Sequence, residues 1–205
     1  MRWDRFFEDL EDQLDEEWEA ERVALDTEAE RLRVSRLTLR ERLSALVAGT
    51  GDAVEATVVE LRDDTVVKGR IAAVGAEWAA LEQAGARSGA LVVPFGAIRG
   101  VGLAHADLLR SARQVALGPR RALAERMGLG FVLRDAGRRR ASVTIRLDGG
   151  RTLAGTIDRA GADHLDIALH EPGTPRRGSE VTGFRVVPFA AIVWVRLEAA
   201  GAALS

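Results

Sequence analysis

Hydrophobic residues recur at helical spacing in the N-terminal part of the chain. Trp3, Phe7, Leu10 and Leu14 follow one another at steps of four, three and four residues, and Trp18 continues the stripe. The surrounding sequence has no glycine or proline, and residues of high helix propensity dominate it. This pattern predicts an amphipathic helix with one apolar face.

The predicted helix covers residues 1–33 and would be roughly 45 Å long. A small domain cannot cover a helix of this length entirely. Three interpretations are open: a solvated helix with one docked face, a coiled-coil or partner-docking arm, or a disordered acidic tail. We expect the stripe to contact a protein partner or a second copy of this chain.

A second pattern is an internal repeat of short strands with alternating polar and apolar residues. At an offset of 86 residues Gly69 aligns with Gly155, and at an offset of 94 residues 92–98 align with residues 186–192. The offset changes at residues 170–178, which are rich in turn formers. Period-two alternation bounded by Asp-Gly turns is typical of half-buried antiparallel strands.

The repeat predicts an α+β fold with two five-stranded antiparallel small barrels in tandem. A helix is expected before each barrel, and the long N-terminal helix precedes both. We expect four segments: an acidic helical arm (1–33), a first barrel with its leading helix (34–103), a basic helical linker (104–141) and a second barrel (142–205). The residues predicted to fill the barrel cores are Ile71, Ile98, Ile157 and Ile192.

The order of strands, turns and central glycines resembles the Sm-like small barrel of the LSm and Hfq proteins. Residues 58–71 and 143–157 resemble the first Sm motif, and residues 93–101 and 187–195 occupy the place of the second. The resemblance implies two Sm-like barrels. It does not extend to uridine recognition, because both loops after the glycine strand lack the asparagine that RNA-binding Sm proteins carry there.

Charge is distributed unevenly along the chain, although the total is only −2. The arm carries −8, the linker carries +6, and the two barrels are neutral. Clustered arginines can neutralise phosphates, and an aromatic ring can stack on a base. The candidate nucleic-acid-binding residues are Arg120, Arg121, Arg138, Arg139, Arg140, Arg176, Arg177 and Trp78. The alternatives are a solvated or salt-bridged face, coverage of the arginines by the acidic arm, and core packing of Trp78.

The sequence has no pattern that predicts catalysis. It contains no cysteine, its three histidines lack metal-ligand spacing, and no nucleophile elbow or phosphate-binding loop occurs. We therefore expect no enzyme activity, no metal, no cofactor and no small-molecule substrate. No apolar run is long enough for a transmembrane helix, and the acidic N-terminus does not resemble a secretory signal, so we expect a cytoplasmic protein.

Two functions fit these expectations. The first is a non-catalytic interaction or scaffold protein, which the neutral barrels and the amphipathic arm favour. The second is a regulator that binds RNA or DNA through the arginines of the linker and the second-barrel loop. The position of the arginines distinguishes the two functions, because nucleic acid needs them on one exposed face.

Overall fold

The computed structural model describes only part of the chain. The described residues are 22, 25–48, 57–83, 89–113, 126–172 and 177–197. The chain divides into two compact units, Met1–Thr38 and Leu39–Ser205. In the first unit residues 25–35 are helical. The predicted contact residues Trp3, Phe7, Leu10, Leu14 and Trp18 lie outside the described residues.

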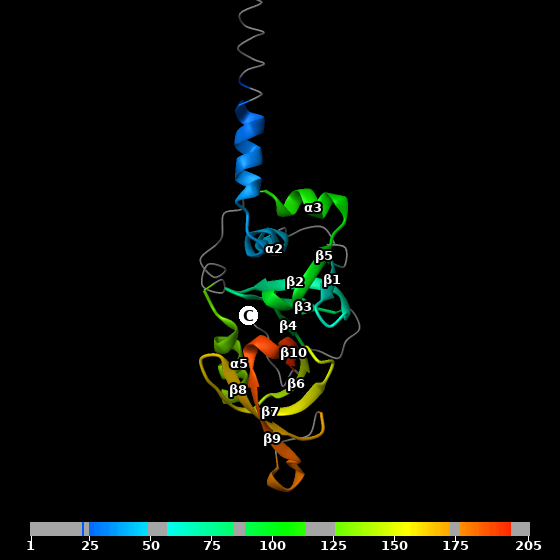
Figure 1. Ribbon diagram of the computed structural model, residues 1–205, viewed down its shortest axis with the longest axis vertical. Helices are drawn as coiled ribbons and strands as arrows, with labels where there is room; N and C mark the ends of the chain where they lie inside the picture. Colours follow the sequence, from blue (N-terminus) through cyan, green and yellow to red (C-terminus); the bar gives the residue numbers. More distant parts are fainter. Residues whose placement is uncertain are drawn as a thin grey trace, which may run out of the picture. The chain divides into compact units, whose positions relative to one another are not determined.

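The described residues of the second unit form one antiparallel sheet of ten strands (Figure 1). Its strand order is β5-β1-β2-β3-β4-β10-β6-β7-β8-β9. The strands of the first repeat are β1 (Thr57–Leu61), β2 (Val66–Val74), β3 (Trp78–Glu82), β4 (Leu91–Pro94) and β5 (Ile98–Gly102). Those of the second repeat are β6 (Ser142–Leu147), β7 (Thr152–Ala160), β8 (His164–Leu169), β9 (Gly183–Pro188) and β10 (Ile192–Leu197).

Helices and short turns complete each repeat. The helices are α2 (Leu39–Ala48) before β1, α3 (His105–Ser111) after β5 and α5 (Leu129–Arg138) before β6. The 3₁₀ turns are η1 (Phe95–Ala97), η2 (Gly178–Glu180) and η3 (Phe189–Ala191). Turns η1 and η3 follow Pro94 and Pro188, so the two copies of the Val-Pro-Phe motif adopt the same structure.

The prediction of two closed, five-stranded Sm-like barrels in tandem is wrong. Strand β4 pairs with β10 of the other repeat, with Val92 opposite Val195 and Leu91 opposite Arg196. The ten strands therefore form one open sheet, whose terminal strands are β5 and β9. In the first unit, residues 25–35 are helical, and residues 1–21 of the predicted helix lie outside the described residues. Alternation predicts which side chains are buried, but it does not specify which strand pairs along a given edge.

The predicted repeat register is correct at the level of single strands. Gly69 lies within β2 and Gly155 within β7, in equivalent positions. A Cβ on Gly155 would lie 2.0 Å from the carbonyl oxygen of Ala168, and one on Gly69 would lie 2.6 Å from that of Glu82. Both positions therefore require glycine because the backbone of the next strand approaches too closely for any side chain.

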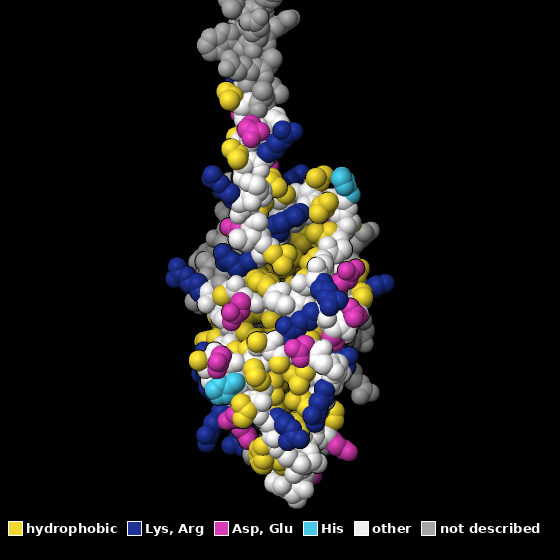
Figure 2. Space-filling view, viewed as in Figure 1, with side chains coloured by type: hydrophobic (Ala, Val, Ile, Leu, Met, Phe, Trp, Pro, Cys, Tyr) yellow, Lys and Arg dark blue, Asp and Glu magenta, His cyan; other side chains and the backbone are white. Residues whose placement is uncertain are grey.

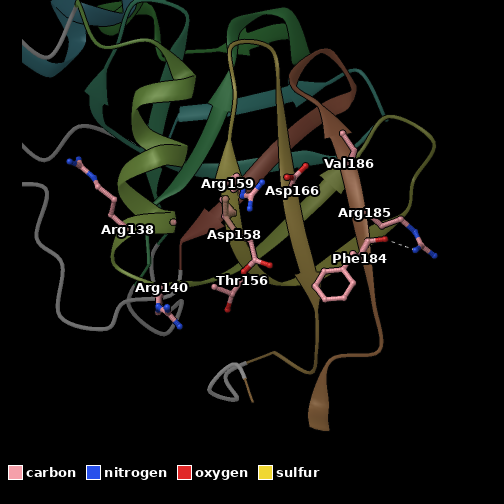
Figure 3. A pocket seen from close by; sticks show the side chains of 11 residues that line it. Arg138, Arg140, Thr156, Asp158, Arg159, Asp166, Phe184, Arg185 and Val186 are labelled. Atoms are coloured by element: carbon pink, nitrogen blue, oxygen red, sulfur yellow. Dashed lines mark hydrogen bonds between the residues drawn. The ribbon is translucent and has the colours of Figure 1, made fainter. Parts of the chain in front are cut away.

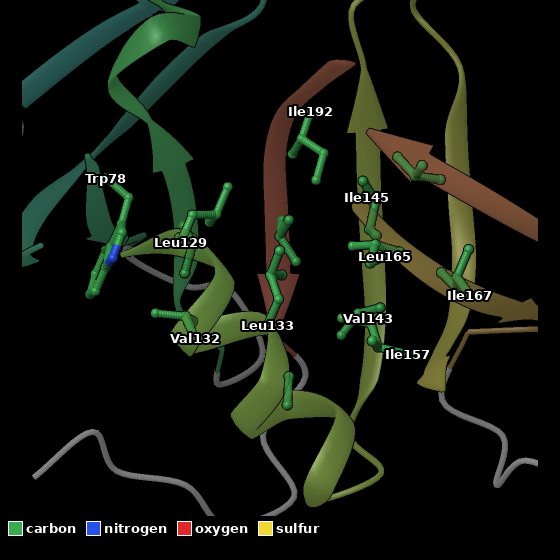
Figure 4. Close-up of a cluster of buried hydrophobic side chains, with 14 of the residues drawn as sticks. Trp78, Leu129, Val132, Leu133, Val143, Ile145, Ile157, Leu165, Ile167 and Ile192 are labelled. Atoms are coloured by element: carbon green, nitrogen blue, oxygen red, sulfur yellow. The ribbon is translucent and has the colours of Figure 1, made fainter. Parts of the chain in front are cut away.

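The largest buried cluster joins side chains from both repeats (Figure 4). Trp78 and Val92 of the first repeat meet Leu129, Val132 and Leu133 of α5 in the second. In a second cluster Val193 packs among residues of β1, β2, β3 and β4. The core is thus continuous across the β4–β10 junction.

The four isoleucines predicted to be core residues differ in burial. Ile71, Ile157 and Ile192 are buried, as predicted, with 4%, 1% and 1% of their surface exposed. Ile98 is only partly buried. It begins β5, which has β1 as its single neighbour among the described strands, and this position explains its exposure.

Polar contacts also cross the junction. Arg146 Nε lies 2.7 Å from Asp63 Oδ2, and the Asp63 side chain is only 2% exposed. Burial acts to raise the pKa of Asp63, but hydrogen bonds from Arg146 and Thr65 outweigh it and hold the pKa below its usual value. The Trp78 indole donates to the Met127 carbonyl at 2.8 Å.

Gly155→Ala is expected to destabilise the protein by about 1–3 kcal/mol, because the new methyl group collides with the β8 backbone. Gly149→Ala is the matched control, since a Cβ there meets nothing within 4 Å. The free energy of unfolding, measured with urea, checks the difference. Equal stability of the two variants would contradict the assigned β7–β8 register.

Asp63→Asn is expected to lower the free energy of unfolding at neutral pH by about 1.5–3 kcal/mol, the range for hydrogen bonds to charged groups. The folded-state pKa of Asp63 is lowered, so its stabilisation is present above the unfolded pKa of about 3.9 and is lost as pH falls through the folded value. The difference between wild type and variant should therefore shrink in acid. Asp64→Asn, at a side chain 86% exposed, should change little.

Candidate functional site

A pocket of about 770 Å³ lies against the outer face of β7, β8 and β9, beside the end of α5 (Figure 3). The residues that line it are Gly137, Arg138, Arg140, Thr156, Ile157, Asp158, Arg159, Asp166, Phe184, Arg185 and Val186. The lining thus comes from α5, from its C-terminal turn and from three neighbouring strands.

Strand register places the sheet residues of the pocket in rows. Arg159 of β7 and Val186 of β9 both lie opposite Asp166 of β8. In the next row, Thr156 and Phe184 both lie opposite Ala168. Directly opposed residues of antiparallel strands project from the same face, so the members of each row lie on one face of the sheet.

The end of α5 contributes the remaining arginines. Gly137 lies against β7, where a Cβ would be 3.2 Å from the carbonyl oxygen of Ile157. Asp135 then binds Arg138 at 3.0 Å and Arg139 at 2.7 Å. Arg140 has φ +51, in the left-handed region that ends many helices. This turn places Arg138 and Arg140 at the rim of the pocket.

The pocket combines positive charge with exposed apolar surface. Four arginines and two aspartates line it, which leaves an excess of positive charge. Phe184 and Val186 are 62% and 68% exposed. Figure 2 shows hydrophobic and basic side chains next to one another over the region that Figure 1 labels β6 to β9. Such a surface suits an acidic ligand that also carries apolar groups.

The sequence-based site residues separate into three groups. Arg138 and Arg140 line the pocket, whereas Arg139 contacts Asp135 and is not part of the lining. Arg177 lies near Glu180, at 3.9 Å, away from the pocket. Arg120, Arg121 and Arg176 lie outside the described residues.

Trp78 does not offer a surface for base stacking. It is 1% exposed and belongs to the core cluster, with its indole hydrogen-bonded to a backbone carbonyl. The prediction of a stacking platform at Trp78 is therefore wrong, because Trp78 is the first residue of β3 and is covered by α5 of the second repeat. The alternative interpretation, core packing, is correct.

Sequence reasoning missed Arg159, Phe184 and Arg185. They are isolated residues in alternating strands rather than members of an arginine run. The alignment of the two repeats carried a signal, since it pairs Arg159 with Ala73 and Phe184 with Ala90. Charged or aromatic residues that replace alanine at equivalent positions indicate a face with a different environment.

A buried histidine lies behind the pocket. His170 is 4% exposed, and its Nε2 atom is 2.8 Å from the hydroxyl of Thr156. His164 instead contacts Asp163, at 2.8 Å. Within the described ranges, no group of three His, Asp or Glu side chains is arranged to hold a metal ion.

Comparisons of the chain with family models, curated proteins and solved structures gave no match. Among the described residues, no helix has the length and apolar character needed to cross a membrane. The function proposed below therefore rests on the pocket and on the second repeat, which forms it.

Proposed function

We propose that this protein is a non-catalytic interaction protein that binds a protein partner on the open face of β7, β8 and β9. The observation that supports this proposal is a difference between the two repeats. The equivalent face of the first repeat is covered by the second repeat, whereas the face of the second repeat is exposed.

Individual residues express this difference. Val92, on β4, is 0% exposed because it belongs to the cluster shared with α5, whereas its equivalent Val186 is 68% exposed. Ala80 is buried in the same cluster, and its equivalent Asp166 lines the pocket. An exposed face with apolar and charged groups is typical of an interaction surface.

The proposal includes the chemistry of the partner and a second contact. Because arginines predominate in the pocket, the partner segment is expected to be acidic. The N-terminal stripe of Trp3, Phe7, Leu10 and Leu14 is proposed to contact a protein partner or another copy of this chain. We place these interactions in the cytoplasm and assign no catalytic step to the protein.

A photo-crosslinking amino acid at position 184 is expected to capture a protein partner in cells, because Phe184 lies on the open face. The same group at position 66 is the control, since Val66 is also exposed, at 56%, but lies away from the pocket. Mass spectrometry identifies the adducts, and position 7 tests the arm. Identical adducts at positions 184 and 66 would refute the proposed surface.

The presence of Arg138, Arg140, Arg159 and Arg185 in the lining of one pocket favours a second candidate function, the binding of single-stranded nucleic acid. In that case full-length protein, and protein beginning at Val34, should bind RNA or DNA with an affinity that falls steeply with salt. Alanine at both Arg138 and Arg140 should reduce the salt slope by about 0.7 for each phosphate that is no longer neutralised.

Arg99→Ala is the matched control for this measurement, because Arg99 is exposed, at 57%, and is paired with Asp64 outside the pocket. Absence of binding at low salt for both lengths of protein would exclude the nucleic-acid function. It would leave the protein-binding proposal intact.

A further inference from the structure

We propose that β9 binds an extended acidic segment of the partner as an added antiparallel β-strand. This inference rests on the proposed function and specifies how the partner is recognised. Among the described strands, β9 ends the sheet and has β8 as its single neighbour. A terminal strand presents backbone donors and acceptors to which another extended chain can add.

The hydrogen bonds of β9 show which of its backbone groups face outward. The Phe189 amide donates to the Asp163 carbonyl at 2.7 Å. Hydrogen-bonded positions alternate along an antiparallel strand, so the backbone groups of Val187 and Arg185 point toward β8. Those of Val186 and Phe184 consequently point toward the free edge.

One outward acceptor is already bonded to a side chain. Arg185 Nη1 donates to the Phe184 carbonyl at 2.7 Å (Figure 3). This guanidinium is exposed and is attached to a flexible side chain, so an arriving backbone amide can replace it at the carbonyl. The released guanidinium would then be available to a carboxylate of the bound segment.

In the first repeat, the strand equivalent to β9 is β4, and its outer edge is already paired with another strand. This neighbouring strand is β10, and in the pairing of β10 with β4 Val195 lies opposite Val92. The Leu197 amide donates to the Ala90 carbonyl at 3.1 Å. At the offset of 94 residues, Ala90 and Val92 correspond to Phe184 and Val186. The junction therefore supplies the register in which a strand adds to β9.

Side-chain alternation then predicts the character of the bound segment. Residues opposite Phe184 and Val186 would contact exposed apolar side chains on the pocket face. The residue between them would lie opposite Arg185 on the other face. A segment that alternates apolar and acidic residues satisfies both faces, because its apolar side chains meet Phe184 and Val186 and its carboxylates meet Arg185.

The pocket favours such a peptide over nucleic acid. Asp158 and Asp166 lie among the arginines, so a continuous chain of phosphates would meet two carboxylates. A nucleic acid also has no amide backbone to pair with the outward groups of Val186. The carboxylates of an extended peptide are spaced two residues apart and can avoid both aspartates.

The test uses full-length protein and dye-labelled peptides of about eight residues, with fluorescence anisotropy as the readout. A peptide of alternating valine and glutamate is expected to bind. An otherwise identical valine–lysine peptide should bind at least about tenfold more weakly because its charge is reversed. A valine–glutamate peptide with N-methylated amides along one edge should also lose about tenfold, because it cannot form the ladder.

Two variants at Val186 test the edge itself. Val186→Pro removes an outward amide and leaves the hydrogen bonds to β8 in place, so it should weaken binding by about tenfold. Val186→Thr keeps the outward amide and the β-propensity, so it should lose less affinity than Val186→Pro. Arg185→Glu should shift the preference toward the valine–lysine peptide, a gain that a merely unfolded variant cannot produce.

Equal binding of the methylated and unmethylated peptides, or an unchanged affinity of Val186→Pro, would overturn strand addition. Sedimentation that shows a second copy of the chain bound at β9 would also overturn it. So would the finding that single-stranded RNA, and no acidic peptide, displaces the labelled peptide. Adducts specific to position 184 would then still support the protein-binding function. Loss of those adducts would instead refute the function itself.

Discussion

The pairing of β4 with β10 is the interaction on which the rest of the structure depends. It joins the two repeats into one sheet and brings α5 onto the first repeat. Burial of Trp78 and Val92 follows from it, as does the contact between Arg146 and the buried carboxylate of Asp63. Each repeat has two edge strands, β4 and β5 in the first and β9 and β10 in the second. Since β4 pairs with β10, strands β5 and β9 remain at the ends of the sheet.

Local structure was predictable from sequence because it depends on local chemistry. Alternation located the strands, and the aligned glycines located two places where backbones approach closely, at Gly69 and Gly155. The junction was not predictable in this way, since ladder hydrogen bonds use backbone groups that every residue shares. For the same reason, the burial of Trp78 could not be distinguished from exposure in a loop.

The candidate site was predictable only where its residues form a run. Arg138 and Arg140 belong to a run of three arginines and were identified. Arg159 and Arg185 occur singly, and a lone arginine on an alternating strand does not by itself indicate a site. These positions stand out only when the two repeats are compared, because the equivalent face is covered in the first repeat and exposed in the second.

The continuous core determines how cooperatively the two repeats fold and unfold. In arrays of stacked repeats, stability is a sum of repeat and interface terms, and end repeats can fray while the remainder persists. Here β4 is completed by β10, and α5 fills its outer face, so neither repeat retains an intact hydrophobic core without the other. The two repeats therefore unfold as one cooperative unit, and a destabilising substitution in either repeat lowers the stability of both.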